Sequence, residues 1–307
     1  MAKKYASTKS VEEYNEYVRK INQDLSELRH YDPDAKSLER YSGEFYELDP
    51  TKKWNAETLR GMMKTAKKVY ESGQLSWDAE QRSKATAIQT LREEYGYDFI
   101  DGRTNEAGYV CHRPGDWIFI DWSDIDKGGD LCAEQILFWQ CRNAMAALSE
   151  LVGLDGEGYR KAADKLKRNI MRDFWREDRG GFVDCYTTGR ENITRHANIF
   201  AIMYDFVTEK RARKITRMVL ENDAITQITT PYFEFFELCA LGKMGKLSAV
   251  QKKIESYWGG MVKLGATSIW EKYNPASDWL PNEKWEGHYE MYGMKYGCSL
   301  CHAWGGG

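Results

Sequence analysis

The chain has 307 residues and nearly balanced charge, with 44 Lys and Arg against 47 Asp and Glu and a formal net charge of -3. This length is sufficient for one large domain, or for one domain with an appendage. A chain without a basic block is not expected to bind nucleic acid, and the absence of an apolar run of about 18 residues argues against a membrane span.

The start of the chain and its cysteines favour a reducing compartment. The opening string MAKKYASTKS is followed by no apolar stretch of the kind found in a secretory signal. Seven cysteines in a chain of this length argue for free thiols more than for a set of disulfides. We therefore expect a cytoplasmic protein.

The first hundred residues differ in composition from the rest. They contain none of the seven cysteines and only two of the 11 tryptophans. Apolar residues recur at three- and four-residue steps from Val11 to Leu28, again before Gly73 and again before Gly96, with Ser10 as a candidate N-cap of the first helix. We expect residues 1–97 to form a charged helical segment, either a partner-binding module or a solvated bundle without a ligand.

The remaining residues, 98–307, alternate helical patterns with aromatic-rich connections. Helical periodicity covers roughly 130–152, 156–177, 194–207, 209–221, 231–242 and 246–264. The short spacing within successive pairs is typical of αα-hairpins. Residues 116–122 and 181–187 are aromatic and β-prone, but they are too short to build a sheet domain. The pattern predicts an all-α fold.

Three connections place carboxylates or histidines beside tryptophans. Their sequences are GDWIFIDWSDID, GATSIWEKY and HYEMYGMKYGCSLCHAW. Sugar sites use this combination, because an indole stacks on a pyranose face while a carboxylate binds hydroxyls or transfers a proton. Packing in the hydrophobic core is the alternative for each tryptophan, since aromatic side chains dominate protein cores.

Six strings match, in order and spacing, those of one enzyme family. They are RTNEAGYVCHRPGDWIFIDWSDIDKGG, LCAEQILF, TRHANIFAIMYDF, QITTPYFEFFEL, YWGGMVKLGATSIWEKYNP and GHYEMYGMKYGCSLCHAWGGG. Through these strings, residues from about 99 to 307 resemble the catalytic domain of the α-L-rhamnosidase-like six-hairpin glycosidases, glycoside hydrolase family 78 and its relatives. The resemblance implies an (α/α)6 toroid that removes terminal α-L-rhamnosyl groups with inversion at the anomeric carbon.

The resemblance also implies a set of site residues. Inversion uses two carboxyl groups about 6.5 to 9.5 Å apart, one as the acid and the other as the base that activates a water. By its position in SIWEKY, Glu271 matches the family's general base. The candidate sugar-binding residues are Asp116, Trp117, Asp121, Arg195, His196, Trp270, His302 and Trp304. The expected ligand is a rhamnoside, and no metal or cofactor is expected.

Two segments of the family have no match in this chain. Upstream of GDW, family members carry an arginine- and tryptophan-rich string that supplies the acid-side carboxylates, and after CHAW they continue into a closing apolar helix. We therefore expect an incomplete toroid whose uncovered hairpin faces can self-associate. Asp121, Asp124 or Glu191 could replace the acid in principle. Two hypotheses follow: a glycosidase of this type, or an inactive protein that acts through sugar binding or through its N-terminal helices.

Three other motifs are weaker. Residues 298–302 spell C-x-x-C-H, the pattern of c-type haem attachment, which requires an export signal that the chain does not show. A zinc site would need a second pair of ligands at structural spacing. Asp124, Asp126 and Asp130 do not fit a twelve-residue calcium loop and are better explained as acidic residues before a helix.

Overall fold

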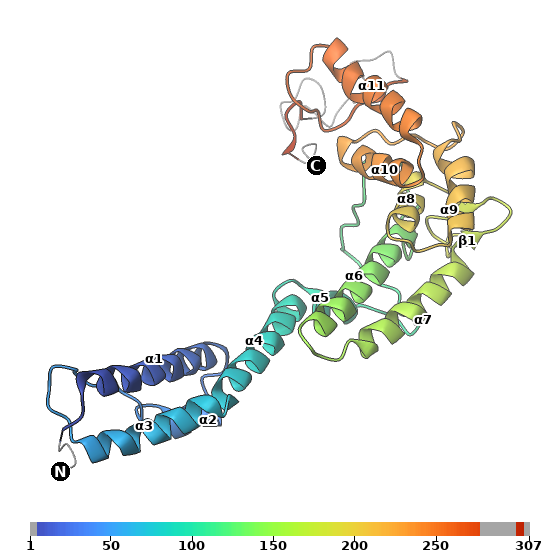
Figure 1. The fold of residues 1–307 in the computed structure, drawn as a ribbon. Coiled ribbons are helices and arrows are strands. Elements are labelled where there is room, and N and C mark those ends of the chain that lie inside the picture. Colours follow the sequence, from blue (N-terminus) through green and yellow to red (C-terminus); the bar gives the residue numbers. More distant parts are fainter. Residues whose placement is uncertain (1–4, 277–298, 304–307) are drawn as a thin grey trace. The chain divides into compact units, whose positions relative to one another are not determined.

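The computed structural model describes residues 5–276 and 299–303. The chain divides into two compact units, residues 1–99 with 148–155 and residues 100–147 with 156–307. Helices dominate both units (Figure 1), which confirms the predicted all-α fold. Within the described residues, no helix is long and apolar enough to cross a membrane.

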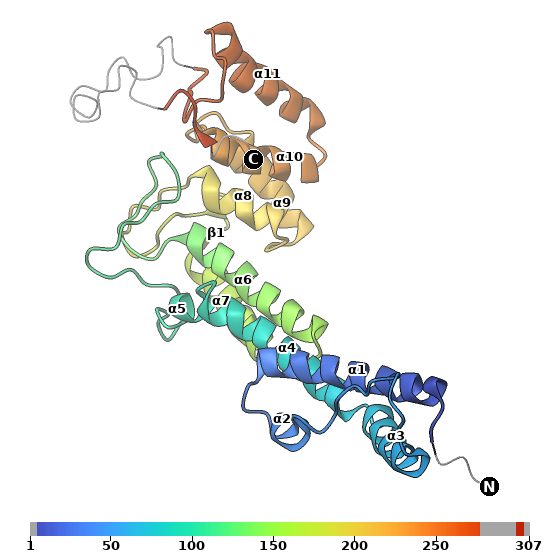
Figure 2. The ribbon, with the colours of Figure 1, turned by 90° about the vertical axis from the view of Figure 1, so that its left-hand side faces the viewer.

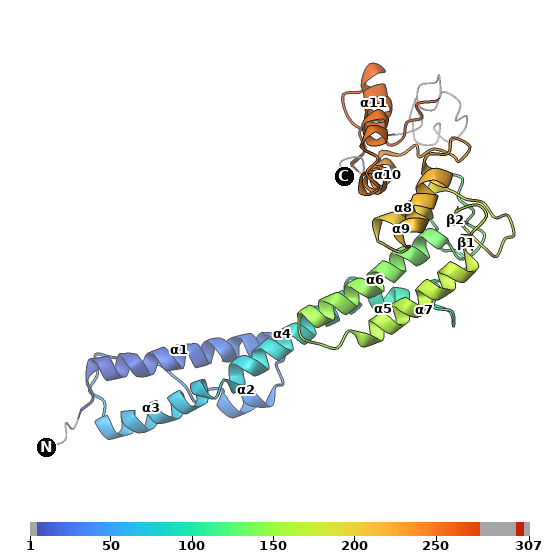
Figure 3. The ribbon, with the colours of Figure 1, turned by 45° about the vertical axis from the view of Figure 1, so that its right-hand side comes forward.

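The first unit is a small helical bundle. Its helices are α1 (Thr8–Tyr31), α2 (Lys36–Tyr41), α3 (Ala56–Glu71) and α4 (Gln74–Glu93), and the short α5 (Tyr97–Asp101) follows. Helix α1 lies along α3 and α4 and runs in the same direction as both (Figures 1 and 3). The apolar stripe that predicts α1 is the face it buries against these neighbours.

The start of α1 differs from the prediction. The side chain of Ser7, not that of Ser10, caps the helix by accepting a hydrogen bond from the Ser10 amide at 3.2 Å. Ser10 therefore lies in the first turn, and its assignment as the N-cap was wrong. The apolar stripe begins only at Val11, whereas polar residues extend the helix one turn further back.

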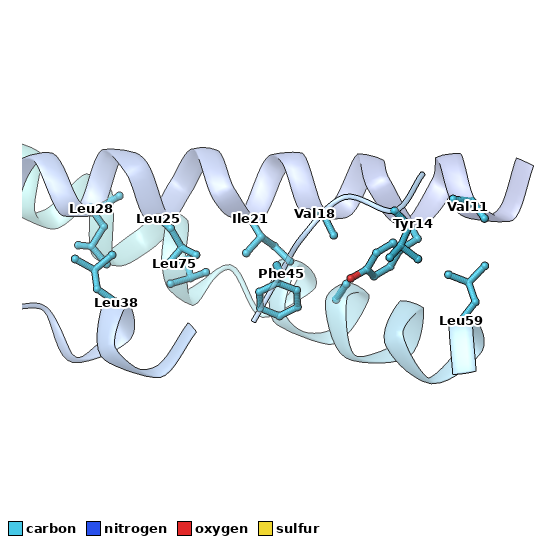
Figure 4. Close-up of a cluster of buried hydrophobic side chains, with 13 residues drawn as sticks. Val11, Tyr14, Val18, Ile21, Leu25, Leu28, Leu38, Phe45, Leu59 and Leu75 are labelled. Carbon is cyan, nitrogen blue, oxygen red and sulfur yellow. The ribbon is translucent and has the colours of Figure 1, made fainter. Parts of the chain in front are cut away.

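The core of the first unit is a continuous row of apolar side chains. Figure 4 shows those of α1 facing residues of α2, α3, α4 and the connection after α2. The buried residues are Val11, Tyr14, Val18, Ile21, Leu25, Leu28, Leu38, Phe45, Leu48, Leu59, Ala66, Leu75 and Ala79. Burial of one such large aliphatic side chain contributes about 1.5 to 3 kcal/mol.

One polar side chain is embedded in this row. Asn15 is buried on α1, where its amide nitrogen donates to the carbonyl of Leu48 at 2.7 Å and its oxygen accepts from the Leu48 amide at 2.8 Å. The side chain therefore satisfies both backbone groups of a buried residue in an irregular connection, as burial of such groups requires.

The second unit consists of helical hairpins. Its helices are α6 (Cys132–Leu151), α7 (Glu157–Asp173), α8 (Arg195–Met203), α9 (Glu209–Ile215) with the π-helical turn η1 (Thr216–Leu220), α10 (Pro231–Lys243) and α11 (Leu247–Lys263). Each coincides with a predicted helical segment to within about one turn. Helices α6 and α7 run side by side (Figures 1 and 3), and α10 lies between α8 and α11 (Figure 2).

Regular β-structure is limited to one short hairpin in the described residues. Strands β1 (Trp175–Arg176) and β2 (Gly181–Phe182) pair antiparallel, with Trp175 opposite Phe182. Residues 116–122, which are also β-prone in sequence, form no strand. They belong to a long irregular connection, residues 102–131, that leads from α5 to α6.

An ion cluster lies inside the second unit, between three helices. Arg195 on α8 pairs with Glu237 on α10, and Lys253 on α11 contacts Glu237 at 3.1 Å and Glu234 at 3.0 Å. Both glutamates are buried. Burial, together with the nearby charge of Glu237, raises the pKa of Glu234 from 4.5 to about 7, and Lys253 opposes this rise.

Substitution of Asn15 by Ala is expected to destabilise the protein by roughly 2 to 3 kcal/mol, because the buried amide and carbonyl of Leu48 both lose their partner. Urea unfolding followed by circular dichroism measures this. Gln23→Ala, on the exposed face of the same helix, is the control and should change stability by about 0.5 kcal/mol or less. Equal stability of the two variants would contradict the role given to Asn15.

The pKa of Glu234 predicts a pH dependence of stability. The folded state keeps a proton that the unfolded state releases, so the free energy of unfolding falls as pH rises from 4.5 to about 7. Glu234→Gln should remove this decline, which amounts to roughly 2 to 3 kcal/mol. Urea unfolding of both proteins at pH 5 and pH 7.5 measures it. Parallel pH dependences of wild type and variant would show that Glu234 titrates normally.

Candidate functional site

A tight turn begins the polar part of the long connection. The Asp116 amide donates to the Arg113 carbonyl at 3.0 Å, and the Arg113 amide donates back to the Asp116 carboxylate at 2.8 Å. Gly115 takes a φ of +93°, which favours glycine. The Arg113 amide and the guanidinium of Arg103, 2.6 Å away, lower the pKa of Asp116. Asp116 is thus held as a carboxylate at a fixed position.

Three aromatic side chains follow this turn and contact one another in sequence. The ring of Trp117 stacks on Phe119 with centroids 5.2 Å apart, and Phe119 meets Trp122 edge to face at 5.0 Å. Trp117 is 80% exposed and Trp122 is 41% exposed. We call these three side chains the aromatic row. Exposed rings of this kind offer an apolar surface to the face of a sugar.

The carboxylate of Glu271 is fixed beside the aromatic row. The indole N–H of Trp122 donates to its Oε1 at 2.8 Å, and the amide of Ser299 donates to its Oε2 at 2.9 Å. The amide of Glu271 in turn donates to the Ser299 carbonyl at 2.8 Å. Each carboxylate oxygen accepts one bond here and keeps a lone pair with which it can accept another.

The segment that contains His302 runs beside the segment that contains Glu271. The His302 amide donates to the Ile269 carbonyl at 3.0 Å, two residues before Glu271. Trp270 points elsewhere, because its ring is buried in a small apolar cluster with Tyr257 and Tyr273. Trp304, the last candidate sugar-binding residue, lies outside the described residues, as does Cys298 of the C-x-x-C-H motif.

Asp121 and His196 meet in the interior of the second unit. Their side chains are joined by a contact of 2.9 Å between Asp121 Oδ2 and His196 Nε2, and each residue is 1% exposed. Asp121 Oδ1 accepts from the Thr230 hydroxyl at 2.6 Å and from the Trp122 amide at 2.8 Å. These two candidate sugar-binding residues therefore contact each other beneath the surface.

The network continues on the far side of His196. His196 Nδ1 lies 3.0 Å from the Thr194 hydroxyl, which donates to Asp184 Oδ1 at 2.7 Å. Asp184 also accepts from the side chain of Asn192 and from the amides of Thr194 and Asp126. Burial raises the pKa of Asp184, and its bonds to Thr194 and Asp126 oppose that rise.

Arg195 lies apart from the aromatic row. Its guanidinium is enclosed by Glu237, by the carbonyl of Leu220 at the end of η1, and by three carbonyls of the connection from η1 to α10, those of Asn222, Ile225 and Thr226. Its side chain has no exposed surface. Arg195 thus joins α8 to the ion cluster.

The three candidate acids differ in access. Asp121 is enclosed, and Glu191 is paired with Arg176 at 2.8 Å. Asp124 is exposed, and its backbone carbonyl accepts from Asn192 at 3.0 Å. Asp124 and Glu191 are both exposed residues, but the carboxylate of Glu191 is held in an ion pair.

Sequence reasoning missed several residues that build the site. Trp122 and Ser299 hold Glu271, and Thr194, Asp184 and Thr230 hold the pair formed by Asp121 and His196. The sequence could have pointed to Trp122 as a site residue, since it stands in the same aromatic string as Trp117. Among the described residues, no three His, Cys, Asp or Glu side chains gather in a way that could hold a metal ion.

Comparisons with known proteins agree with this architecture. The similar solved structures include a rhamnosidase from Klebsiella oxytoca with rhamnose bound, at 25% identity and a TM-score of 0.57, covering 76% of this chain and 43% of that one. They also include the GH78 family rhamnosidase of Bacillus sp. GL1, at 21% identity and a TM-score of 0.54, covering 75% of this chain and 22% of that one. This chain therefore spans less than half the length of either protein. A search of curated proteins finds no match.

A family match extends over almost the whole chain. The family described as bacterial alpha-L-rhamnosidase 6 hairpin glycosidase domain matches residues 7–307. This range includes the N-terminal helices, which the six sequence strings do not cover. The chain therefore belongs to the family of bacterial α-L-rhamnosidase six-hairpin glycosidase domains.

Proposed function

We propose that this chain is an inverting α-L-rhamnosidase domain in which Glu271 is the general base. The observation that carries the proposal is the fixed carboxylate of Glu271, held by Trp122 and Ser299 beside an exposed row of aromatic rings. A similar structure, the rhamnosidase from Klebsiella oxytoca, contains bound rhamnose, which supports a carbohydrate ligand here.

In the proposed reaction, Glu271 accepts a proton from a water as the water oxygen attacks the anomeric carbon. The bond from that carbon to the glycosidic oxygen breaks, and a second carboxyl group protonates the leaving oxygen. Because the side chain of Glu271 is already held in position, it does not have to be ordered during the reaction. The aromatic row would stack on the sugar, and Asp116 would accept hydrogen bonds from its hydroxyls.

The proposed reaction needs a second carboxyl group as proton donor. Asp124 is the strongest of the three candidates, because it is an exposed residue, whereas Asp121 is enclosed and Glu191 is paired with Arg176. A chain that lacks an effective acid would lose about 10² to 10⁴ in rate and would act by binding sugar alone. Sugar binding without hydrolysis is therefore the second candidate function, and a hydrolysis assay distinguishes it from the first.

Hydrolysis of p-nitrophenyl α-L-rhamnopyranoside by the full chain tests the assignment of the base. Glu271→Gln should lower kcat by at least about 10²-fold, because the amide cannot accept the proton from water. Glu255→Gln, on the exposed face of α11, is the matched control and should leave the rate unchanged. Equal rates for wild type and Glu271→Gln would exclude Glu271 as the base. No turnover by folded protein would favour the sugar-binding alternative.

Trp117→Ala tests the aromatic row without requiring turnover. Loss of this 80% exposed ring should weaken rhamnose binding by about fivefold, the equivalent of roughly 1 kcal/mol of stacking. Titration of rhamnose, followed by NMR, measures the affinity. Trp77→Ala, which removes an exposed indole from the first unit, should leave it unchanged. An unaltered affinity in Trp117→Ala would mean that the row is not the sugar surface.

A further inference from the structure

A continuous chain of hydrogen bonds leads from Glu271 into the interior of the second unit. It passes from the carboxylate to the indole of Trp122, then along the backbone of Trp122 to Asp121, and from Asp121 to His196. Glu271 is half-buried, whereas Asp121 and His196 are each 1% exposed. Asp121 and His196, at the interior end of this series of hydrogen bonds, therefore have no surface that could contact a sugar.

The bonds around His196 fix the position of one of its protons. The Thr194 hydroxyl gives its hydrogen to Asp184, so its oxygen can only accept from His196, and Nδ1 of the imidazole must be the donor. One further proton then lies between His196 Nε2 and Asp121 Oδ2. Wherever that proton resides, the two side chains together carry no net charge, so that no unpaired charge is buried.

Asp121 is anchored by groups from separate elements. Thr230 stands at the N-cap of α10, His196 lies in the first turn of α8, and both contact the Asp121 carboxylate. The third contact is the amide of Trp122, the next residue in the chain. Because Asp121 cannot shift without breaking bonds to two helices, the direction in which the chain leaves it toward Trp122 is set.

We propose that Asp121 is a positioning residue, and that its buried pair with His196 sets the orientation of Trp122 so that the indole N–H meets Glu271. The mechanistic importance of this role rests on the proposed function of Glu271 as base, but the orientation itself does not. The resemblance to rhamnosidases implies that Asp121 and His196 contact the sugar. The structure instead assigns Asp121 and His196 to holding Trp122, the residue that contacts Glu271.

The conservative variant separates positioning from charge. In Asp121→Asn, the amide nitrogen can donate to Nε2 of a neutral His196, while the amide oxygen still accepts from Thr230 and from the Trp122 amide. This variant should therefore preserve the network. Asp121→Ala removes all three contacts and should release the indole. A role that depends on the carboxylate charge would make both variants equally defective.

The indole N–H signal of Trp122 in ¹⁵N–¹H NMR spectra, assigned with Trp122→Phe, reports the orientation directly and needs no activity. Asp121→Ala should shift this signal toward that of Glu271→Ala and speed its exchange with water. Asp121→Asn should match wild type, as should the control Asp124→Asn, which alters an exposed carboxylate in the same connection. If Asp121→Ala does not fold, Thr230→Val, which removes one anchor, should move the signal in the same direction.

The kinetic measurement adds a second readout. On p-nitrophenyl α-L-rhamnopyranoside, Asp121→Ala should lower kcat by about 10²-fold with little change in KM, and Asp121→Asn should stay within about threefold of wild type. A Trp122 signal that is unchanged in the folded variants lacking an anchor would overturn the proposal, as would an Asp121→Asn variant as defective as Asp121→Ala. An inactive wild type with the expected NMR shifts would refute the proposed function but uphold the positioning role.

Discussion

The second unit is organised around the burial of a short helix that carries polar side chains. Every residue of α8 from Arg195 to Ile202 is buried, and three of them, Arg195, His196 and Asn198, must find partners inside the protein. Buried polar groups without partners cost about 1 to 3 kcal/mol each, so this requirement constrains whatever surrounds the helix. Each of these three side chains finds its hydrogen-bonding partner in a different neighbouring element.

The partners of α8 hold the second unit together. Arg195 joins it to α10 through Glu237, and Lys253 extends the contact to α11. Asn198 bonds both backbone groups of Phe182 in β2, at 2.9 and 3.2 Å. His196 reaches Asp121 in the long connection that precedes α6. An irregular connection of that length would ordinarily be mobile, but here its middle is tied to the most enclosed helix of the unit.

The periodicity of apolar residues predicted the helices of the fold, but it could not predict the long-range contacts that form the site. The helices of the second unit follow from apolar spacing, because a helix must bury one face against a neighbour. The bond between Trp122 and Glu271 joins residues 149 positions apart, and spacing says nothing about such pairs. Likewise, residue type alone could not distinguish an Asp121 that binds sugar from one that is enclosed with a histidine. That distinction depends on burial, which only the folded chain reveals.

The site thus combines two environments with different physical requirements. Trp117 is left open to solvent, where a ligand can displace water from its ring. The carboxylate of Glu271 is in the opposite situation, because hydrogen bonds to both of its oxygens fix its position without any ligand. Trp122 belongs to both environments, since its ring extends the exposed row while its indole N–H holds Glu271 and its amide is held by Asp121. Trp122 therefore connects the enclosed Asp121 to the exposed row, and the carboxylate of Glu271 is held both by this residue and by the Ser299 segment beside it.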